Sequence, residues 1–265
     1  MIALCITYVD GLERLVDDPR LTFHYLRVGS WHDPPKLREV VDQYPGRPFL
    51  YHYNHNLPAG AAQTATIIET LRSAASITST PWLSAHLDQH SDDEITGLLR
   101  HGRRPPPYSP SAAFERICGA VRRIQPHLPV PLLLENVPHW PLPEPDVGVT
   151  PGFIRDVLDE TGCDFLLDTA HAVVSAHAFG IAPRAYIAAL PLERLVEVHV
   201  SGPRMRDGRM VDSHEPLDDD DLKLLTWLLA RTTPQVVTLE YARDAAEFPD
   251  QIMRLNQVLD ASNVT

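Results

Sequence analysis

Cysteine is scarce in this chain of 265 residues, and the three cysteines that occur lie far apart. Cys5, Cys118 and Cys163 form no CxxC pair. An odd number of dispersed cysteines suits neither a disulfide framework nor a zinc site built from thiolates. We therefore expect each cysteine to be a small buried apolar residue rather than a nucleophile or a metal ligand.

Basic residues are also in deficit. The chain has 23 Lys and Arg against 35 Asp and Glu, which gives a formal net charge of −12. A protein that holds nucleic acid through its phosphates needs a basic surface, so this balance argues against nucleic acid as a partner. Bound cations would neutralise part of the acidity, although an ordinary solvated acidic surface explains most of it.

Long apolar runs and several common catalytic motifs are missing. No segment approaches the length of a membrane span, which argues against a membrane partner. The first residues, MIALCITYVD, lack the basic start and the apolar length of a signal peptide, so we expect a cytoplasmic protein. The sequence also contains no glycine-rich phosphate loop, no HExxH and no signature of a Ser–His–Asp triad.

Eight short β-rich runs alternate with longer amphipathic stretches. Several of the runs, such as VPLLLE and DFLLD, are continuously apolar at their centres, which is typical of strands buried on both faces. The predicted strands are Ile2–Ile6, Phe23–Val28, Pro48–Tyr53, Trp82–His86, Val130–Glu135, Asp164–Asp168, Leu195–Val200 and Val236–Glu240.

The stretches between the strands carry helix signals. Thr150 before Pro151 indicates an N-cap and a first-turn proline, and Gly162 indicates the end of that helix. The acidic run Asp218–Asp221 lies where negative charge favours a helix start. Further helices are predicted over Ala61–Ile77, Ser111–Gln125 and Ala245–Leu259, and from Pro183 onward. The alternation predicts one α/β domain over residues 1–265, a (β/α)₈ TIM barrel with short helices in its first two units.

In such a barrel the chemistry lies at the C-terminal ends of the strands. A single histidine there is more often structural than functional. Carboxylates gathered at one rim, however, repel one another and cost several kcal/mol each when buried unpaired, and cations solve that problem. The convergent side chains exceed the needs of one tetrahedral zinc, so we predict two or three ions of iron, manganese or zinc. The predicted ligands are His52, His86, Glu135, Asp168, His171, His199, Asp212, His214 and Glu240.

At these residues the chain resembles the multinuclear non-haem iron-dependent oxidases, which are TIM barrels. The likeness runs from about His52 to the neighbourhood of Asp244. PPPYSPSAAFERICGAVRRIQPHLPVPLLLENVPHW is similar to the family's PxPY…LLLEN block, and the stretch from TGCDFLLDTAH to LVEVHVSG is similar to its LLLD…EIHLAG block. MVDSHEP and VVTLEYARD are similar to its DTH and IEWD segments. The order and spacing of these motifs are specific, whereas each short motif alone is not.

The chain departs from the family pattern at two positions. DTAH supplies His171 where the family usually has Asn after the Asp of the sixth strand, and Pro203 stands where the family's HLAGH segment ends in His. DTAH is more similar to the DTCH signature of the AP-endonuclease branch of barrels, whose members carry three zinc ions and cleave phosphodiesters. The wider xylose-isomerase-like barrels share parts of the same ligand set.

The resemblance implies a cofactor of two or three iron ions (Fe²⁺/Fe³⁺), with O₂ bound at one iron and the substrate at another. The expected substrate is a cysteine-like residue of a peptide or a small molecule derived from an amino acid, as in natural product biosynthesis. A separate protein would present a peptide substrate. His55 and Tyr108 lie beside the predicted site loops and are the candidate catalytic residues, either contacting substrate or orienting ligands.

Three alternatives stay open at the level of the sequence. A zinc- or manganese-dependent phosphoester hydrolase is supported by DTAH, although the acidic charge disfavours polyanionic substrates. A sugar isomerase with one divalent metal would need only four of the predicted ligands, namely Glu135, Asp168, His199 and Glu240. A barrel used as a binding scaffold would hold no stoichiometric metal, but such a scaffold has no need for so many ionisable groups around one mouth.

Overall fold

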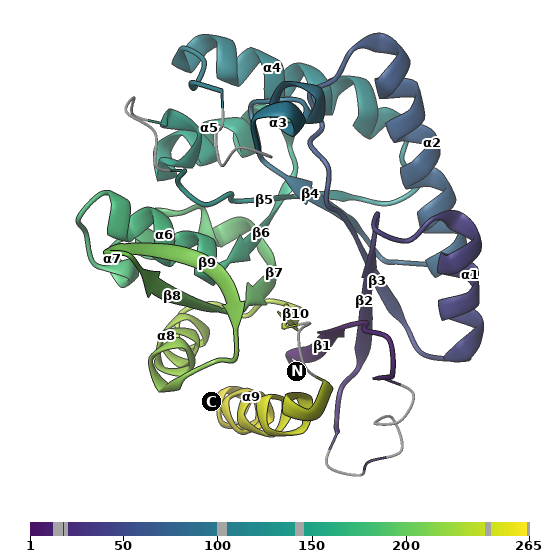
Figure 1. Ribbon diagram of the computed structural model, residues 1–265, viewed down its shortest axis with the longest axis vertical. Helices are drawn as coiled ribbons and strands as arrows, with labels where there is room; N and C mark the ends of the chain where they lie inside the picture. The colour runs from purple at the N-terminus through teal and green to yellow at the C-terminus, as the bar shows by residue number, and fades with distance from the viewer. Residues whose placement is uncertain (13–17, 19–20, 100–104, 141–145, 242–244, 264–265) are drawn as a thin grey trace.

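The structure is a computed structural model that describes residues 1–12, 18, 21–99, 105–140, 146–241 and 245–263. Eight parallel strands close into a barrel in which each strand pairs with the next one along the chain, and the last returns to pair with β1 (Figure 1). The predicted TIM barrel is therefore confirmed. Its strands are β1 Ala3–Thr7, β2 Tyr25–Gly29, β3 Phe49–Tyr53, β4 Leu83–His86, β5 Leu132–Glu135, β6 Asp164–Asp168, β7 Leu195–Val200 and β10 Val236–Leu239.

Helices surround this barrel (Figure 1). They are α1 Pro34–Gln43, α2 Ala61–Thr78, α3 Asp92–Leu99, α4 Pro110–Ile124, α5 Pro151–Thr161, α6 Thr169–Ala178, α7 Pro183–Ala189, α8 Asp219–Leu229 and α9 Phe248–Asn263. The sequence did not single out α3 or α6. The described residues between β1 and β2 contain no α-helix, so the predicted short helix of the first unit is not found there. No described helix is long and apolar enough to span a bilayer.

The helix ends follow the residues that indicated them. Pro151 occupies the first turn of α5, and Gly162 ends the helix in the left-handed region with φ 69°. Its N–H donates to the carbonyl of Leu158, which satisfies one of the last carbonyls of the helix. At α8, the Asp218 side chain accepts the backbone N–H of Asp221, and the Asp221 side chain accepts that of Asp218. This reciprocal capping explains the acidic run.

The connection between β7 and α8 contains two further strands that the sequence analysis did not identify. Strands β8 (Gly202–Arg206) and β9 (Arg209–Glu215) form an antiparallel hairpin between β7 and α8. Its turn is Asp207–Gly208, both with positive φ, which is the backbone that a two-residue hairpin requires. The prediction overlooked this Asp-Gly signal. Asp212 and His214 therefore lie on β9 rather than in an irregular loop.

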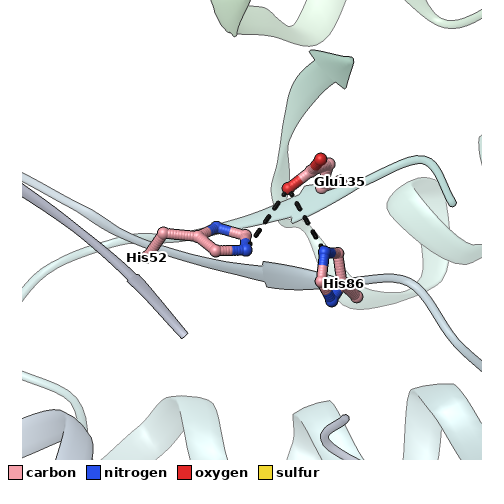
Figure 2. A group of neighbouring side chains, drawn as sticks. All are labelled: His52, His86 and Glu135. Carbon is pink, nitrogen blue, oxygen red and sulfur yellow. Dashed lines mark ion pairs between the residues drawn. The ribbon is translucent and has the colours of Figure 1, made fainter. Parts of the chain in front are cut away.

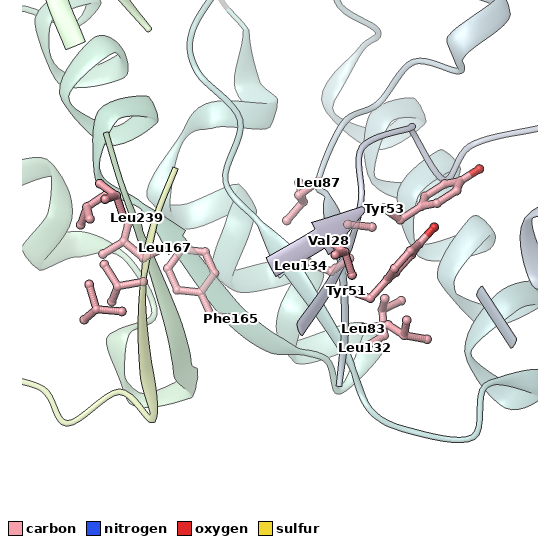
Figure 3. Packing of buried hydrophobic residues seen from close by; sticks show 14 of the residues in the cluster. Val28, Tyr51, Tyr53, Leu83, Leu87, Leu132, Leu134, Phe165, Leu167 and Leu239 are labelled. Carbon is pink, nitrogen blue, oxygen red and sulfur yellow. The ribbon is translucent and has the colours of Figure 1, made fainter. Parts of the chain in front are cut away.

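The strands separate two kinds of buried side chain. Residues such as Val28, Tyr51, Leu134 and Phe165 belong to the large core cluster, and Figure 3 shows these side chains packed in it. Every second residue faces the barrel interior instead. There, a cluster that we call the inner apolar layer consists of Cys5, Leu50, Trp82, Leu133, Leu166 and Val236. All three cysteines are free and buried, as predicted.

Candidate metal centre

Strand ends deliver most of the predicted ligands to one place. Side chains alternate along a strand, so the residue two positions after each member of the inner apolar layer also faces the interior, one step nearer the C-terminal rim. These positions form what we call the polar layer, and they include His52, Glu135 and Asp168. His86 pairs in register with Glu135, and Asp168 with His199. Adjacent strands therefore present ligand-type side chains side by side.

Two groups of ligand-type atoms meet at Glu135. His52, His86 and Glu135 form the first group, and Glu135, Asp168, His199 and Glu240 form the second. Within each group the potential ligand atoms lie within 4.8 Å of one another. Figure 2 shows His52 and His86 reaching towards the same carboxylate from neighbouring strands, with Nε2 atoms 3.5 and 3.9 Å from Glu135 Oε2. Glu135 thus belongs to both groups.

The remaining predicted ligands adjoin the second group. Asp168 caps helix α6 by accepting the backbone N–H of His171, which places His171 at the rim. Its Nε2 lies 3.3 Å from Asp212 Oδ2, and His214 Nε2 lies 3.0 Å from the same oxygen. His214 adopts φ 46°, an uncommon conformation for a residue with a side chain. The nine predicted ligands therefore occupy one contiguous cluster.

The second nitrogen of each rim histidine is tied to the protein. His171 Nδ1 lies 2.8 Å from the carbonyl of Asn136, and His214 Nδ1 lies 2.9 Å from the carbonyl of Glu240. A carbonyl only accepts, so each Nδ1 donates its hydrogen to a carbonyl, and each Nε2 faces the carboxylate of Asp212. His52 Nδ1 similarly pairs with the Ser84 hydroxyl at 2.9 Å. This arrangement is typical of histidines that bind metal through the other nitrogen.

Several buried ligand-type atoms have no hydrogen-bond partner among the described residues. Polar atoms excluded from water normally find a partner, because leaving one unpaired costs about 1–3 kcal/mol. Here the exceptions concentrate in the cluster, and the donor set of imidazole nitrogens and carboxylate oxygens suits iron, manganese or zinc. The residues present therefore fit a metal centre. The unpartnered ligand-type atoms of the cluster are His52 Nε2, Glu135 Oε2, Asp168 Oδ2, His199 Nδ1 and Asp212 Oδ1.

The electrostatics of the cluster are strained without cations. Burial lowers the pKa of His52 well below its usual value. Burial also disfavours charge on His199, but the neighbouring carboxylates of Glu240 and Glu135 outweigh it and raise that pKa. Burial raises the pKa of Asp168 to about 7. Without metal, some of these buried side chains therefore hold protons, and a bound cation would displace those protons.

Three supporting residues were not foreseen from the sequence. Arg27, buried in the middle of β2, forms an ion pair with Glu240. Asn136 joins two strand ends, because its amide oxygen accepts the Asp168 N–H and its amide nitrogen donates to the Asp168 carbonyl. Ser84 is the register partner of His52 on the neighbouring strand β4. The usable signal was alternation: Arg27 interrupts the apolar run YLRVG at an inward position.

Comparison with known proteins places the chain in a family. Residues 32–263 match the family described as RiPP precursor modification enzyme MbnB/TglH/ChrH. The chain belongs to this family. It is the family of multinuclear iron-dependent oxidases to which the motifs pointed, so that resemblance is confirmed. The last residues of the VVTLEYARD segment, 242–244, lie outside the described residues.

Relatives of this chain include proteins whose names give no activity. A UPF0276 protein of Caulobacter vibrioides is 25% identical over 252 residues, which cover 94% of this chain and 87% of the relative. A UPF0276 protein of Bordetella pertussis is 37% identical over 135 residues, which cover 49% of this chain and 47% of the relative.

Solved structures with the same fold include sugar epimerases. D-allulose 3-epimerase from Methylomonas sp. superposes with a TM-score of 0.63 at 13% identity, covering 98% of this chain and 97% of the epimerase. D-psicose 3-epimerase from Clostridium cellulolyticum H10 gives 0.60 at 12% identity, covering 99% of both chains. Identities this low show the fold alone. They agree with the TIM barrel that the sequence indicated.

The two candidate catalytic residues, His55 and Tyr108, have different surroundings. His55 lines a cavity of about 750 Å³ together with His86, His171 and Glu240, and its Nδ1 lies 2.9 Å from Asp92 Oδ2. Tyr108 is not part of the described lining of that cavity.

The Tyr108 hydroxyl instead donates to Glu94, and the guanidinium of Arg116 lies over its ring. These contacts hold the segment before α4 against α3. The structure thus brings His55 to the mouth of the cluster and leaves Tyr108 in a packing role away from the cavity.

A second cavity lies on the other side of the hairpin. It has a volume of about 1510 Å³ and is lined by β8, β9 and the start of α8. None of the predicted ligands lines it, and its charged residues pair with one another, as Arg204 does with Asp221 and Arg254 with Asp219. The smaller cavity is therefore the better candidate for chemistry.

Proposed function

We propose that this chain is a multinuclear non-haem iron oxidase that uses O₂ to oxidise a cysteine-like or amino-acid-derived substrate. The observation that carries the proposal is the set of unpartnered buried ligand atoms gathered around Glu135. Membership of a family of peptide-modifying enzymes supports a peptide substrate, presented by a separate protein chain, or a small molecule with the same reacting group.

Each group of ligand-type atoms would hold one ion. His52, His86 and Glu135 would bind the first, and Glu135 with Asp168, His199 and Glu240 the second. Asp212 lies between His171 and His214 and would complete the second site or hold a third ion with them. Iron bound there supplies redox equivalents and open coordination positions for O₂ and substrate.

The cavity above the cluster would select and orient the substrate. Trp31, Val137 and Trp140 contribute apolar surface to its lining, so a bound substrate would displace water from the mouth. The carboxylates on its floor disfavour polyanionic ligands. Of the lining residues, Asp88 and Asp92 add further negative charge near the mouth. A neutral or cationic peptide segment suits this lining better than a phosphate ester.

His55 would handle a proton at the edge of the cavity. The hydrogen bond to Asp92 raises the pKa of His55 and holds its ring by Nδ1. The other nitrogen, Nε2, is then available to a substrate in the cavity. We propose that His55 exchanges a proton with the thiol or amide of the substrate, while Asp92 keeps the imidazole oriented.

The test of this function is O₂ consumption. Protein loaded anaerobically with Fe²⁺ would be mixed with cysteine-containing peptides and free thiol compounds, and O₂ uptake would be followed together with product mass. We expect uptake that depends on both iron and thiol and that is lost in Glu135→Gln. The proposal fails if no thiol-bearing candidate drives O₂ consumption and O₂ leaves the optical spectrum of the iron unchanged.

A second candidate is a metal-dependent isomerase or hydrolase of the same barrel type. The observation that favours it is that Glu135, Asp168, His199 and Glu240 form a complete one-metal set by themselves. His52→Ala distinguishes the candidates, because a one-metal isomerase would retain its metal and activity without His52. A zinc- or manganese-dependent hydrolase would instead cleave model phosphodiesters and lose that activity in His171→Ala.

A further inference from the structure

Glu197 is a buried carboxylate that lies beneath the metal centre and is not one of its expected ligands. It stands on β7 two residues before His199 and is 2% exposed. Trp82 Nε1–H donates to its Oε2 at 2.8 Å, and the Thr238 hydroxyl donates to its Oε1 at 2.6 Å. His199 Nε2 lies 3.2 Å from the same Oε1. Two donors and one imidazole nitrogen therefore converge on this carboxylate.

The chemistry of these partners fixes the hydrogen on His199. An indole N–H can only donate, and a carboxylate is the group that accepts from several donors at once. His199 Nε2 therefore carries a hydrogen and donates it to Glu197. In the neutral imidazole that a metal requires, the lone pair is therefore on Nδ1, which lies 3.2 Å from Glu240 Oε1 and 3.6 Å from Glu135 Oε1. Nδ1 is also one of the atoms without a hydrogen-bond partner.

A purely structural role explains Glu197 poorly. No Lys or Arg among the described residues forms an ion pair with it. Apolar residues of similar volume would pack more cheaply in this position, because a buried carboxylate gives up its hydration. The neighbouring inward positions of the inner apolar layer are occupied by apolar residues such as Leu133 and Leu166. The position of Glu197 is accounted for by the imidazole that it contacts.

We propose that Glu197 is a positioning residue of the metal centre. Through its contact with His199 Nε2 it selects the tautomer and ring orientation that present Nδ1 to the metal. Trp82 and Thr238 hold the carboxylate in place from below. This inference rests on the metal centre of the proposed function, but it requires neither iron specifically nor any particular substrate.

The test uses Glu197→Gln, which keeps the shape of the side chain. If its amide nitrogen faces His199, it donates to Nε2 and forces the hydrogen onto Nδ1. If the nitrogen faces Trp82, two donors oppose each other. Removing such a contact typically weakens metal binding about 10- to 100-fold. We therefore expect Zn²⁺ and anaerobic Fe²⁺ to bind about 10- to 100-fold more weakly, with the circular dichroism of the metal-free protein unchanged.

Trp82→Phe is the matched control. It removes a hydrogen bond from the same carboxylate without touching His199, so its loss of metal affinity should be several-fold smaller than that of Glu197→Gln. A second readout needs no variant. In zinc-loaded protein with ¹⁵N-labelled histidine, long-range ¹H–¹⁵N spectra should show His199 bound to zinc through Nδ1 and protonated at Nε2.

Distinct results separate the inference from the function on which it rests. Wild-type protein that binds neither Zn²⁺ nor Fe²⁺ would overturn the metal centre itself. If the wild type binds metal and Glu197→Gln binds it with the same affinity, the positioning role alone is overturned. The same holds if Trp82→Phe loses as much metal affinity as Glu197→Gln. If Glu197→Gln fails to fold, the nitrogen spectra of the wild type decide: zinc on Nε2 of His199 would contradict the inference.

Discussion

Two layers of the barrel interior, two residues apart on the same strands, are built in opposite ways. The inner apolar layer contains Leu50, Leu133 and Leu166, which pack against one another. The polar layer contains His52, Glu135 and Asp168 at the next inward positions of the same three strands. Both layers are excluded from solvent, so burial alone does not distinguish them. Only the polar layer holds ligand-type atoms that lack a hydrogen-bond partner.

The difference shows where this fold gives up stability for function. Apolar side chains stabilise the barrel through burial, at roughly 25 cal/mol per Å². Ionisable side chains in the same environment cost free energy unless they are paired. A cluster of them persists at a site where something other than the fold requires it. In the described part of the chain, the rim is that site, and bound cations would offset its cost.

The largest expected effect comes from breaking the polar layer at its shared member. Glu135→Gln keeps the side-chain volume but replaces the charged carboxylate with a neutral amide that has a single oxygen. Both ligand groups include Glu135. We expect the variant to lose metal from both groups, measured as metal ions per chain after equilibrium dialysis.

Glu160→Gln is the control for that change. Glu160 is an exposed residue of α5 paired with Arg122, and exposed pairs contribute about 0–1 kcal/mol. Its metal content should equal that of the wild type. Equal metal content in Glu135→Gln and Glu160→Gln would contradict a shared ligand.

The second-largest effect is expected from a change in the inner apolar layer, which should reduce stability without reducing metal binding. Leu133→Ala removes a fully buried side chain two residues before Glu135. A cavity of this kind costs about 2–5 kcal/mol of unfolding free energy. Urea unfolding of the metal-free protein should show this loss, while the folded fraction binds as much metal as the wild type. A variant of unchanged stability that lost its metal would show that the two layers are not separable.

Metal should stabilise the folded protein by a comparable but smaller amount. Ions that bind only the folded state at about 100 times their dissociation constant add about 2.7 kcal/mol. Chelation should therefore lower the melting temperature of the wild type and leave that of Glu135→Gln nearly unchanged. Calorimetry with and without chelator measures both. A wild type insensitive to chelation would mean that the polar layer is not held together by cations.

The smallest effect lies far from either layer. Gly162 ends α5 with φ 69°, and a Cβ there would meet no atom within 4 Å, so only the backbone conformation opposes a side chain. Gly162→Ala should cost about 1 kcal/mol of unfolding free energy. Its metal content should not change. A loss of metal in this variant would indicate that general destabilisation, rather than the polar layer, controls binding.

The sequence predicted the barrel because its strands carry local signals. Runs such as DFLLD are apolar at their centres, and β6 has the predicted bounds. Helix α6 was missed because it begins directly after β6, with no connecting loop to mark a boundary. The hairpin was missed because β9 is half-buried along its length and lacks a clean alternation. Local patterns are weakest where one element follows another without a break.

The site was predictable to the extent that strand ends converge in this fold. That rule placed His52, Glu135 and Asp168 together without any knowledge of distances. It gave no information about Arg27 or Glu197, which lie at inward positions whose partners are remote in sequence. Glu197, for example, contacts Trp82 across 115 residues. Such contacts depend on barrel register, which the sequence patterns do not specify.

The most direct test of the central claim is elemental analysis of wild-type and Glu135→Gln protein, purified without chelator or affinity nickel. Iron, zinc and manganese would be counted per chain, after growth in iron-rich medium. The account predicts two or more metal ions per wild-type chain, mainly iron, and loss of that metal in the variant. A wild type that carries no metal, or one ion that survives Glu135→Gln, would contradict it.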